Sequence, residues 1–162
     1  MVRKSFLYIV AILCISGTTA SPSIAQQGPQ RGLATMPLEV VSKSGKHQFL
    51  VELATTYRQQ AIGMMGRTKL DPDKGMFFVY GNAERRGYWM KDCLIYLDII
   101  YIKEDGRIAN IIRNAAPGDL NPRHSRGPVL AVLELAGGRA KELGIRPGDK
   151  VLHSIFKPAK SK

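Results

Sequence analysis

The sequence predicts a mostly β fold, a small closed or partly closed β-barrel of about eight short strands with two short helices. The apolar runs are too short for helices and fit strands better. Turn residues separate these runs along the whole chain, which has 16 glycines and 9 prolines. Many short apolar runs divided in this way are typical of a curled or closed sheet.

The stretch Gly75–Gly106 is central to this prediction, because it holds the only tryptophan and most of the aromatic residues. Three strands are expected in it, over Met76–Tyr80, Tyr88–Lys91 and Ile95–Lys103. Both faces of the third strand are apolar, which predicts burial on both sides. Asp98 is the exception on that strand, and a carboxylate in such surroundings requires a partner.

The remaining elements follow from the same patterns. The chain is expected to form a hairpin over Leu38–Ser42 and His47–Ala54. A helix should follow, begun by the capping box of Thr56 and Gln59 or by Thr55 as the cap, and it should run to about Met64 with Gly66 as C-cap. The later elements expected are a strand over Arg107–Arg113 paired with the Ile95 strand, a strand over Val129–Leu135, a helix over Arg139–Leu143 and a last strand over Val151–Phe156. Ala115–Pro128 is the longest irregular stretch, and long loops in compact domains are often functional.

The N-terminus has the pattern of a secretory signal peptide: basic residues, a short apolar run, and small residues at Ser23 and Ala25. A lipid-anchor signal at Cys14 is disfavoured, because Leu13 is bulky where that signal needs a small residue. The expected organisation is a signal peptide over 1–25, a disordered leader over 26–36, a single β-barrel domain over 37–157 and a basic tail over 158–162. We therefore expect a periplasmic or secreted protein without stable membrane insertion after cleavage.

Charge and cysteine content restrict the partners. The formal net charge is +11, but the basic residues are spread along the chain and no recognition motif is present, so no nucleic-acid partner is expected. In an exported protein this charge favours solubility and weak attraction to an anionic envelope. Cys93 is the one cysteine after the predicted signal peptide, so an internal disulfide in the mature chain is excluded. The expected state is a monomer.

Several short motifs follow one another along the mature chain: Gly63-Met64-Met65-Gly66-Arg67 with Leu70, Gly75–Val79, Trp89-Met90-Lys91, Leu97-Asp98, Val132–Leu135 with Gly137, and Gly144-Ile145 with Gly148-Asp149. In this order, from about Leu38 to Phe156, they resemble the family called domain of unknown function 192. The resemblance implies an exported bacterial or archaeal protein with a compact β-rich domain and no established activity. Asp92-Cys93 stand where the family usually has Asn-Thr, which puts in doubt any role of that amide or hydroxyl.

A ligand pocket is expected at one end of the barrel. Its expected lining residues are Trp89, Lys91 and Asp98, with Arg67, Arg123, His124 and Arg126 at its rim. Aromatic rings beside a few charged groups are the usual composition of a small-molecule site. The alternative for Asp98 is a structural role, in which it accepts hydrogen bonds from loop N–H groups and holds strand ends together. The predicted role is non-catalytic binding of an unknown small molecule or envelope component, with no cofactor.

A second hypothesis is a small hydrolase-like enzyme. It would use Asp98 with Glu134, or Cys93 as a nucleophile with His124 as its base. The favoured alternative for Cys93 is a small buried residue, because free cysteines are usually buried and behave as apolar residues.

A third hypothesis is copper handling by the thioethers of Met64, Met65, Met76 and Met90. Methionine also fills irregular gaps in a core, and the sequence has no tight cluster of methionine or histidine. No metal site is therefore predicted.

Overall fold

The computed structural model describes residues 28–156. Its elements are β1 Thr35–Ser42, β2 Gly45–Ala54, α1 Tyr57–Ile62, β3 Lys74–Glu84, β4 Gly87–Tyr88, β5 Leu97–Ile102, β6 Ile108–Ala115, β7 Arg123–His124, β8 Val129–Ala136, α2 Arg139–Glu142 and β9 Lys150–Leu152. The predicted signal peptide over 1–25 and the predicted tail over 158–162 lie outside the described residues.

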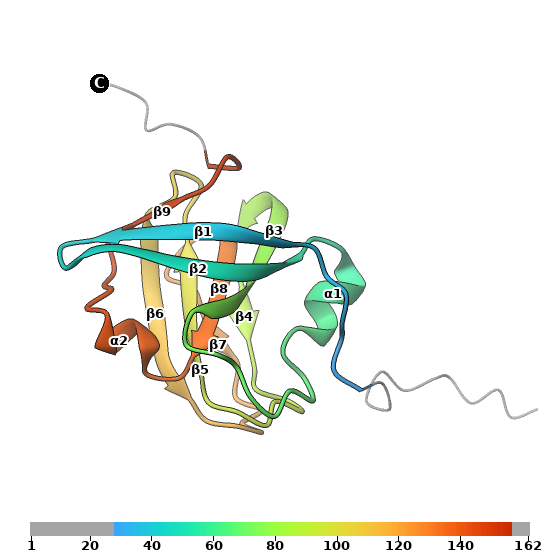
Figure 1. Cartoon of the computed structure of the whole chain (residues 1–162). Coiled ribbons are helices and arrows are strands. Elements are labelled where there is room, and N and C mark those ends of the chain that lie inside the picture. The colour runs from blue at the N-terminus through green and yellow to red at the C-terminus, as the bar shows by residue number, and fades with distance from the viewer. Residues whose placement is uncertain (1–27, 157–162) are drawn as a thin grey trace, which may run out of the picture.

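Seven of these strands form one sheet in the order β6-β5-β8-β3-β2-β1-β9, and β4 pairs with β7 in a separate two-stranded sheet. Figure 1 shows the large sheet curling into a half-barrel, with α1 and α2 on opposite sides of it. The mostly β fold class and the partly closed barrel predicted from the sequence are confirmed.

The first hairpin is longer than predicted. β1 and β2 pair from Thr35 opposite Glu52 to Ser42 opposite Gly45. The alternating apolar residues of both strands are buried, as in a sheet with one face on the core. β1 begins inside the segment 26–36, which the sequence analysis assigned to a leader. The extra residues of β1 pair with the second half of β2, where Thr35 lies opposite Glu52 and Met36 opposite Val51.

The helix α1 begins as predicted and ends earlier. The Thr56 hydroxyl accepts a hydrogen bond from the Gln59 N–H, and the Gln59 side chain accepts one from the Thr56 N–H, which completes the capping box. The C-cap is Gly63 and not Gly66, so the predicted extension to Met64 is wrong. Gly63 has φ +49° and ψ −128°, a conformation with positive φ that glycine adopts without strain, and the helix ends there.

The stretch Gly75–Gly106 contains the three predicted strands, but their lengths differ from the prediction. β3 runs on to Glu84, whereas the predicted strand Tyr88–Lys91 shrinks to the two residues of β4. The backbone turns after β4, where Asp92 has φ 55°. All six residues of β5 are buried, which confirms the predicted burial on both faces.

The last strand is also shorter than predicted. β9 ends at Leu152, because the next residues form a turn in which the Phe156 N–H donates to the His153 carbonyl oxygen. The side chain of Phe156 still packs against the core.

Alternate residues of the central strands divide the core into two layers. The inner core fills the half-barrel and receives buried residues from all seven strands of the large sheet, for example Leu133 from β8 and Ile100 from β5. The outer core lies on the other face of β3, β5 and β8, under the loops that contain Met64, Met90 and Cys93. The candidate site lies in this outer layer.

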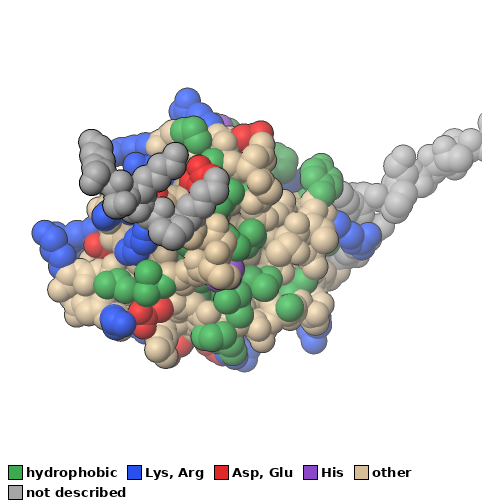
Figure 2. Space-filling view, turned by 90° about the horizontal axis from the view of Figure 1, so that it is seen from above, with side chains coloured by type: hydrophobic (Ala, Val, Ile, Leu, Met, Phe, Trp, Pro, Cys, Tyr) green, Lys and Arg blue, Asp and Glu red, His purple; other side chains and the backbone are tan. Residues whose placement is uncertain are grey.

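The charged residues are distributed over the surface. On the face shown in Figure 2, Lys and Arg side chains are spaced around the edge with hydrophobic and acidic side chains between them. Within residues 28–156, no helix is long and apolar enough to cross a membrane.

Candidate functional site

A pocket of about 220 Å³ opens on the outer face of the sheet. It is bounded by α1 and the segment that follows it, by β3, by β4 and the loop after it, and by β8. The lining residues are Gln60, Ala61, Ile62, Gly63, Met64, Met65, Phe78, Tyr80, Gly87, Tyr88, Trp89, Cys93 and Glu134. The pocket therefore lies beside the half-barrel and not at the predicted end of it.

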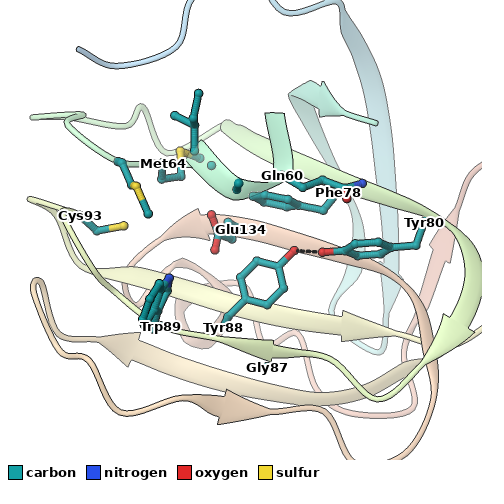
Figure 3. A pocket seen from close by; sticks show the side chains of 13 residues that line it. Gln60, Met64, Phe78, Tyr80, Gly87, Tyr88, Trp89, Cys93 and Glu134 are labelled. Atoms are coloured by element: carbon teal, nitrogen blue, oxygen red, sulfur yellow. Dashed lines mark hydrogen bonds between the residues drawn. The ribbon is translucent and has the colours of Figure 1, made fainter. Parts of the chain in front are cut away.

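Glu134 supplies the only carboxylate among the described residues that line this pocket. It is 4% exposed, and Figure 3 shows its carboxylate in the middle of the cavity. On the neighbouring strands it lies opposite Met76 and Ile99, which offer it no polar group. No residue in the described part of the chain makes a hydrogen bond or an ion pair with this carboxylate. Burial raises its pKa from 4.5 to about 8, so the ligand-free protein holds mainly a neutral carboxylic acid here at pH 7.

Three aromatic rings form one wall of the pocket. Phe78 and Tyr80 are two residues apart on β3 and so point to the same face of the sheet. The Tyr80 and Tyr88 hydroxyls share a hydrogen bond of 2.5 Å, and the Phe78 ring stands edge-on to Tyr88 at 5.2 Å between centroids. Burial raises the pKa of both tyrosines, so both phenols remain neutral at pH 7.

Trp89 lies at the rim of the pocket. It follows β4, is 51% exposed, and has the Lys91 ammonium 5.6 Å from its ring centroid. It is the only tryptophan of the chain, so its fluorescence reports on this one site. Lys91 itself does not line the pocket, and neither does any other lysine, arginine or histidine of the described residues.

Three sulfur-containing side chains, those of Met64, Met65 and Cys93, also line the pocket. Met64 follows the C-cap of α1, and Cys93 lies in the loop after Trp89 (Figure 3). Cys93 is 7% exposed, and burial, with smaller contributions from the Glu134 and Asp92 carboxylates, raises the pKa of its thiol to about 12. The thiol is therefore protonated at neutral pH, and it is a weak nucleophile in that form.

His124, the base considered for Cys93, does not line the pocket. It belongs to β7, opposite Gly87 of β4, where a Cβ at Gly87 would lie 2.7 Å from the His124 ring. The structure therefore does not bring the hypothetical nucleophile and base together at this site.

Asp98 has a structural position. Its buried carboxylate accepts hydrogen bonds from the N–H groups of Asn114, Gly138 and Ala140, at 2.7, 3.0 and 2.7 Å. These bonds join β5 to the end of β6 and to the start of α2, as the structural alternative predicted. Asp98 lies opposite Leu135, whereas Glu134 lies opposite Ile99, so the two carboxylates point to opposite faces of the sheet. They do not form the carboxylate pair considered for a hydrolase.

The other predicted site residues are dispersed. Arg67 forms an ion pair with Glu52 and borders a different surface depression. Arg123 pairs with Asp119 at 2.5 Å. Arg126 borders a third depression, beside Lys103 and Asp105. Of the residues predicted to form the ligand pocket, only Trp89 lines the pocket that contains Glu134.

The pocket predicted from the sequence did not include Glu134, Met64 or the rings of Phe78, Tyr80 and Tyr88. Glu134 was a candidate only in the hydrolase hypothesis, and Met64 only in the copper hypothesis. Glu134 carried a signal, because it is the only charged residue of the apolar strand β8. That signal resembles the one at Asp98, and the sequence alone does not separate a satisfied buried carboxylate from an unsatisfied one.

The methionines considered for copper are divided between the core and the pocket. Met64, Met76 and Met90 are buried in the outer core, and only Met64 and Met65 line the pocket. Among the described residues, no three histidine, cysteine or acidic side chains are grouped so that they could hold a metal ion.

The curled sheet and the cavity on its outer face define a small β half-barrel protein with a lateral pocket. Residues 39–153 match the family described as DUF192, Uncharacterized ACR, and the chain belongs to this family, as its motifs predicted.

The solved structures that are similar to the chain include two bacterial proteins. One is a crystal structure of a protein of unknown function from Novosphingobium aromaticivorans DSM 12444, with 44% identity, a TM-score of 0.75, and coverage of 83% of this chain and 94% of that one. The other is from Sinorhizobium meliloti 1021 and was proposed to be a transcription regulator, with 36% identity, a TM-score of 0.75, and coverage of 78% and 98%. No curated protein matched the chain significantly.

Proposed function

We propose that this protein is an exported, non-catalytic binding protein whose ligand is a small, mainly apolar molecule held in the lateral pocket. The observation that carries this proposal is the Glu134 carboxylate, buried without a partner among the described residues at the base of a cavity with aromatic walls. A buried polar group without a hydrogen bond costs free energy, and a ligand that pairs with it recovers that cost. Aromatic walls around a few polar groups are typical of small-molecule sites.

The composition of the pocket favours binding over catalysis. General acid–base or nucleophilic catalysis uses a reactive group together with a second group that activates it. Here the Cys93 thiol is protonated, and Asp98 and His124 lie elsewhere. Glu134 is then the one group of the described pocket whose raised pKa suits proton transfer, and no lining residue is placed to activate it.

The Sinorhizobium structure was proposed to be a transcription regulator, but the described fold of this chain does not favour binding to DNA. A recognition helix must be long enough to lie in the major groove of DNA. In residues 28–156 the two helices have six and four residues. The basic side chains are also separated on the face in Figure 2.

The export part of the proposal rests on the N-terminal pattern. We expect cleavage after Ala25, so that the mature chain begins at Gln26, followed by release to the periplasm or the medium. Mass spectrometry of the exported protein measures this directly. An intact N-terminus, or a lipid on Cys14, would contradict the proposal.

The binding part is tested by Trp89 fluorescence during a screen of small aromatic and aliphatic fragments against the mature protein. The variant Ala61→Leu adds apolar volume to the pocket wall and keeps a good helix-forming residue. The control is Tyr57→Leu, on the same helix but 86% exposed and outside the pocket. We expect fragments to bind wild type and Tyr57→Leu equally, and Ala61→Leu at least roughly tenfold more weakly. Equal binding to all three proteins, or no fragment binding, would refute a ligand function for this pocket.

A further inference from the structure

The ionisable groups that line the pocket are all acids. They are the carboxyl group of Glu134, two phenols and one thiol, and no lysine, arginine or histidine of the described chain lies among the lining residues. An anionic ligand would therefore meet a carboxylate without any basic side chain to pair with. A cationic ligand would find in Glu134 the one group that becomes its counter-ion when the proton leaves.

The hydroxyl groups and the side-chain amide of the pocket have partners other than Glu134. The Tyr80 and Tyr88 hydroxyls bond to each other. The Gln60 amide nitrogen donates to the carbonyl oxygens of Ala54 and Val79. Within the described residues, the pocket thus presents a carboxyl group that no neighbouring donor satisfies.

The aromatic rings strengthen the preference for positive charge. The faces of Trp, Tyr and Phe rings carry negative electrostatic potential and attract ammonium groups. Trp89 already lies near one ammonium, that of Lys91, at 5.6 Å. Figure 3 shows Phe78, Tyr88 and Trp89 around the Glu134 carboxylate, so a group that reaches the carboxylate also meets the rings.

We propose that the lateral pocket binds a small organic ammonium, whose positive charge pairs with the Glu134 carboxylate and whose apolar body packs against Phe78, Tyr88 and Trp89. This inference rests on the proposed binding function and names its ligand class. A volume of about 220 Å³ is below the roughly 300–1,000 Å³ typical of sites for drug-sized molecules. The ligand is therefore smaller than a drug molecule.

Binding of an ammonium is coupled to release of a proton. Because burial raises the pKa of Glu134 to about 8, the ligand-free site carries a proton at pH 7, and pairing with a cation removes it. The proton leaves to the solvent, and the ligand's charge replaces it in the pocket. Affinity for an ammonium accordingly rises between pH 6 and pH 8, whereas affinity for an uncharged ligand does not rise with pH.

The test uses two pairs of probes that match in shape and differ in charge. Choline is compared with 3,3-dimethylbutan-1-ol, and 3-methylbutylamine with 3-methylbutan-1-ol. Each probe is titrated into the mature protein at pH 6, 7 and 8, with Trp89 fluorescence as the readout. Calorimetry in two buffers of different ionisation enthalpy then measures the proton released. The variants are Glu134→Gln, which keeps the volume and removes the charge, and Glu39→Gln on β1, outside the pocket, as the control.

At pH 8 we expect at least one ammonium to bind roughly tenfold or more tightly than its alcohol. Its binding at pH 7 releases close to one proton, and Glu134→Gln removes the preference, whereas Glu39→Gln keeps it. If alcohol and ammonium bind alike, or if Glu134→Gln binds ammonium as well as wild type does, the ammonium inference is wrong and the pocket still binds ligands. If none of the four probes binds but the fragments above do, only the ligand class is refuted. Failure of both experiments refutes the proposed function as well.

Discussion

Replacement of Glu134 by glutamine should change how the stability of this protein depends on pH. The folded protein holds the Glu134 proton up to about pH 8, whereas the unfolded chain releases it near pH 4.5. Between these values the folded state binds more protons than the unfolded state, so the free energy of unfolding of the wild type falls as pH rises. Above about pH 8 both states are ionised, and this loss is complete.

The size of the effect follows from the same two values. Each pH unit between the unfolded and folded pKa corresponds to about 1.36 kcal/mol. The interval from 4.5 to about 8 therefore corresponds to up to roughly 5 kcal/mol. The glutamine of the Glu134→Gln variant would stay neutral in both states, so the variant should lack this loss and gain stability relative to the wild type as the pH rises to 8. A typical domain has a total stability of about 5–15 kcal/mol, so the difference is measurable.

Urea unfolding followed by Trp89 fluorescence provides the measurement, at about pH 5, 6, 7 and 8. The difference in unfolding free energy between wild type and Glu134→Gln should grow in favour of the variant across this range. Titration of every other group cancels in that difference, and Glu39→Gln should follow the wild type. Parallel curves for wild type and Glu134→Gln would show that Glu134 is ionised throughout, and the account of an unpaired buried carboxyl group would fail.

Three further predictions concern Asp98, Cys93 and Thr56. Asp98→Asn should lower the free energy of unfolding by about 1–3 kcal/mol, because one amide oxygen cannot accept all three N–H groups. Fragment binding should be unchanged. A variant that keeps wild-type stability but loses fragment binding would contradict the structural role of Asp98. Cys93 should react slowly with a thiol reagent in native protein and quickly in denaturant, because it is buried and its pKa is raised to about 12; fast native labelling would refute this. Thr56→Ala should lower the free energy of unfolding by about 1 kcal/mol, measured by urea unfolding, because the capping box is lost. Thr55→Ala is the control. If Thr56→Ala is no more destabilising than Thr55→Ala, the capping role of Thr56 is contradicted.

Local patterns predicted most of the architecture. The capping box at Thr56 and the buried β5 depend on residues close together in the chain, so their signals are complete in the sequence. Three of the errors fall where the chain turns: at the C-cap of α1, at the end of β4 and at the end of β9. Each of these ends depends on a backbone turn that apolar periodicity does not register, such as the positive φ of Gly63 and of Asp92.

The candidate site was predicted less completely, because a pocket is made by segments far apart in the chain. Trp89, which the sequence shows as a lone tryptophan after a loop, is the predicted site residue that lines the pocket. The basic residues grouped with it from the sequence are separated in space, where Arg67 pairs with Glu52 and Arg123 with Asp119. Those ion pairs neutralise side chains that the sequence presents only as charges.

Asp98 and Glu134 show most clearly which properties follow from the local sequence and which depend on the tertiary structure. Asp98 and Glu134 each lie on an apolar strand, and that pattern alone is enough to predict that both are buried. The strand register in the folded sheet then makes Asp98 face the N–H groups of α2 and β6, while Glu134 faces a cavity. The two outcomes differ because burial follows from the local hydrophobic pattern, whereas the partner of a buried charge comes from a distant part of the chain.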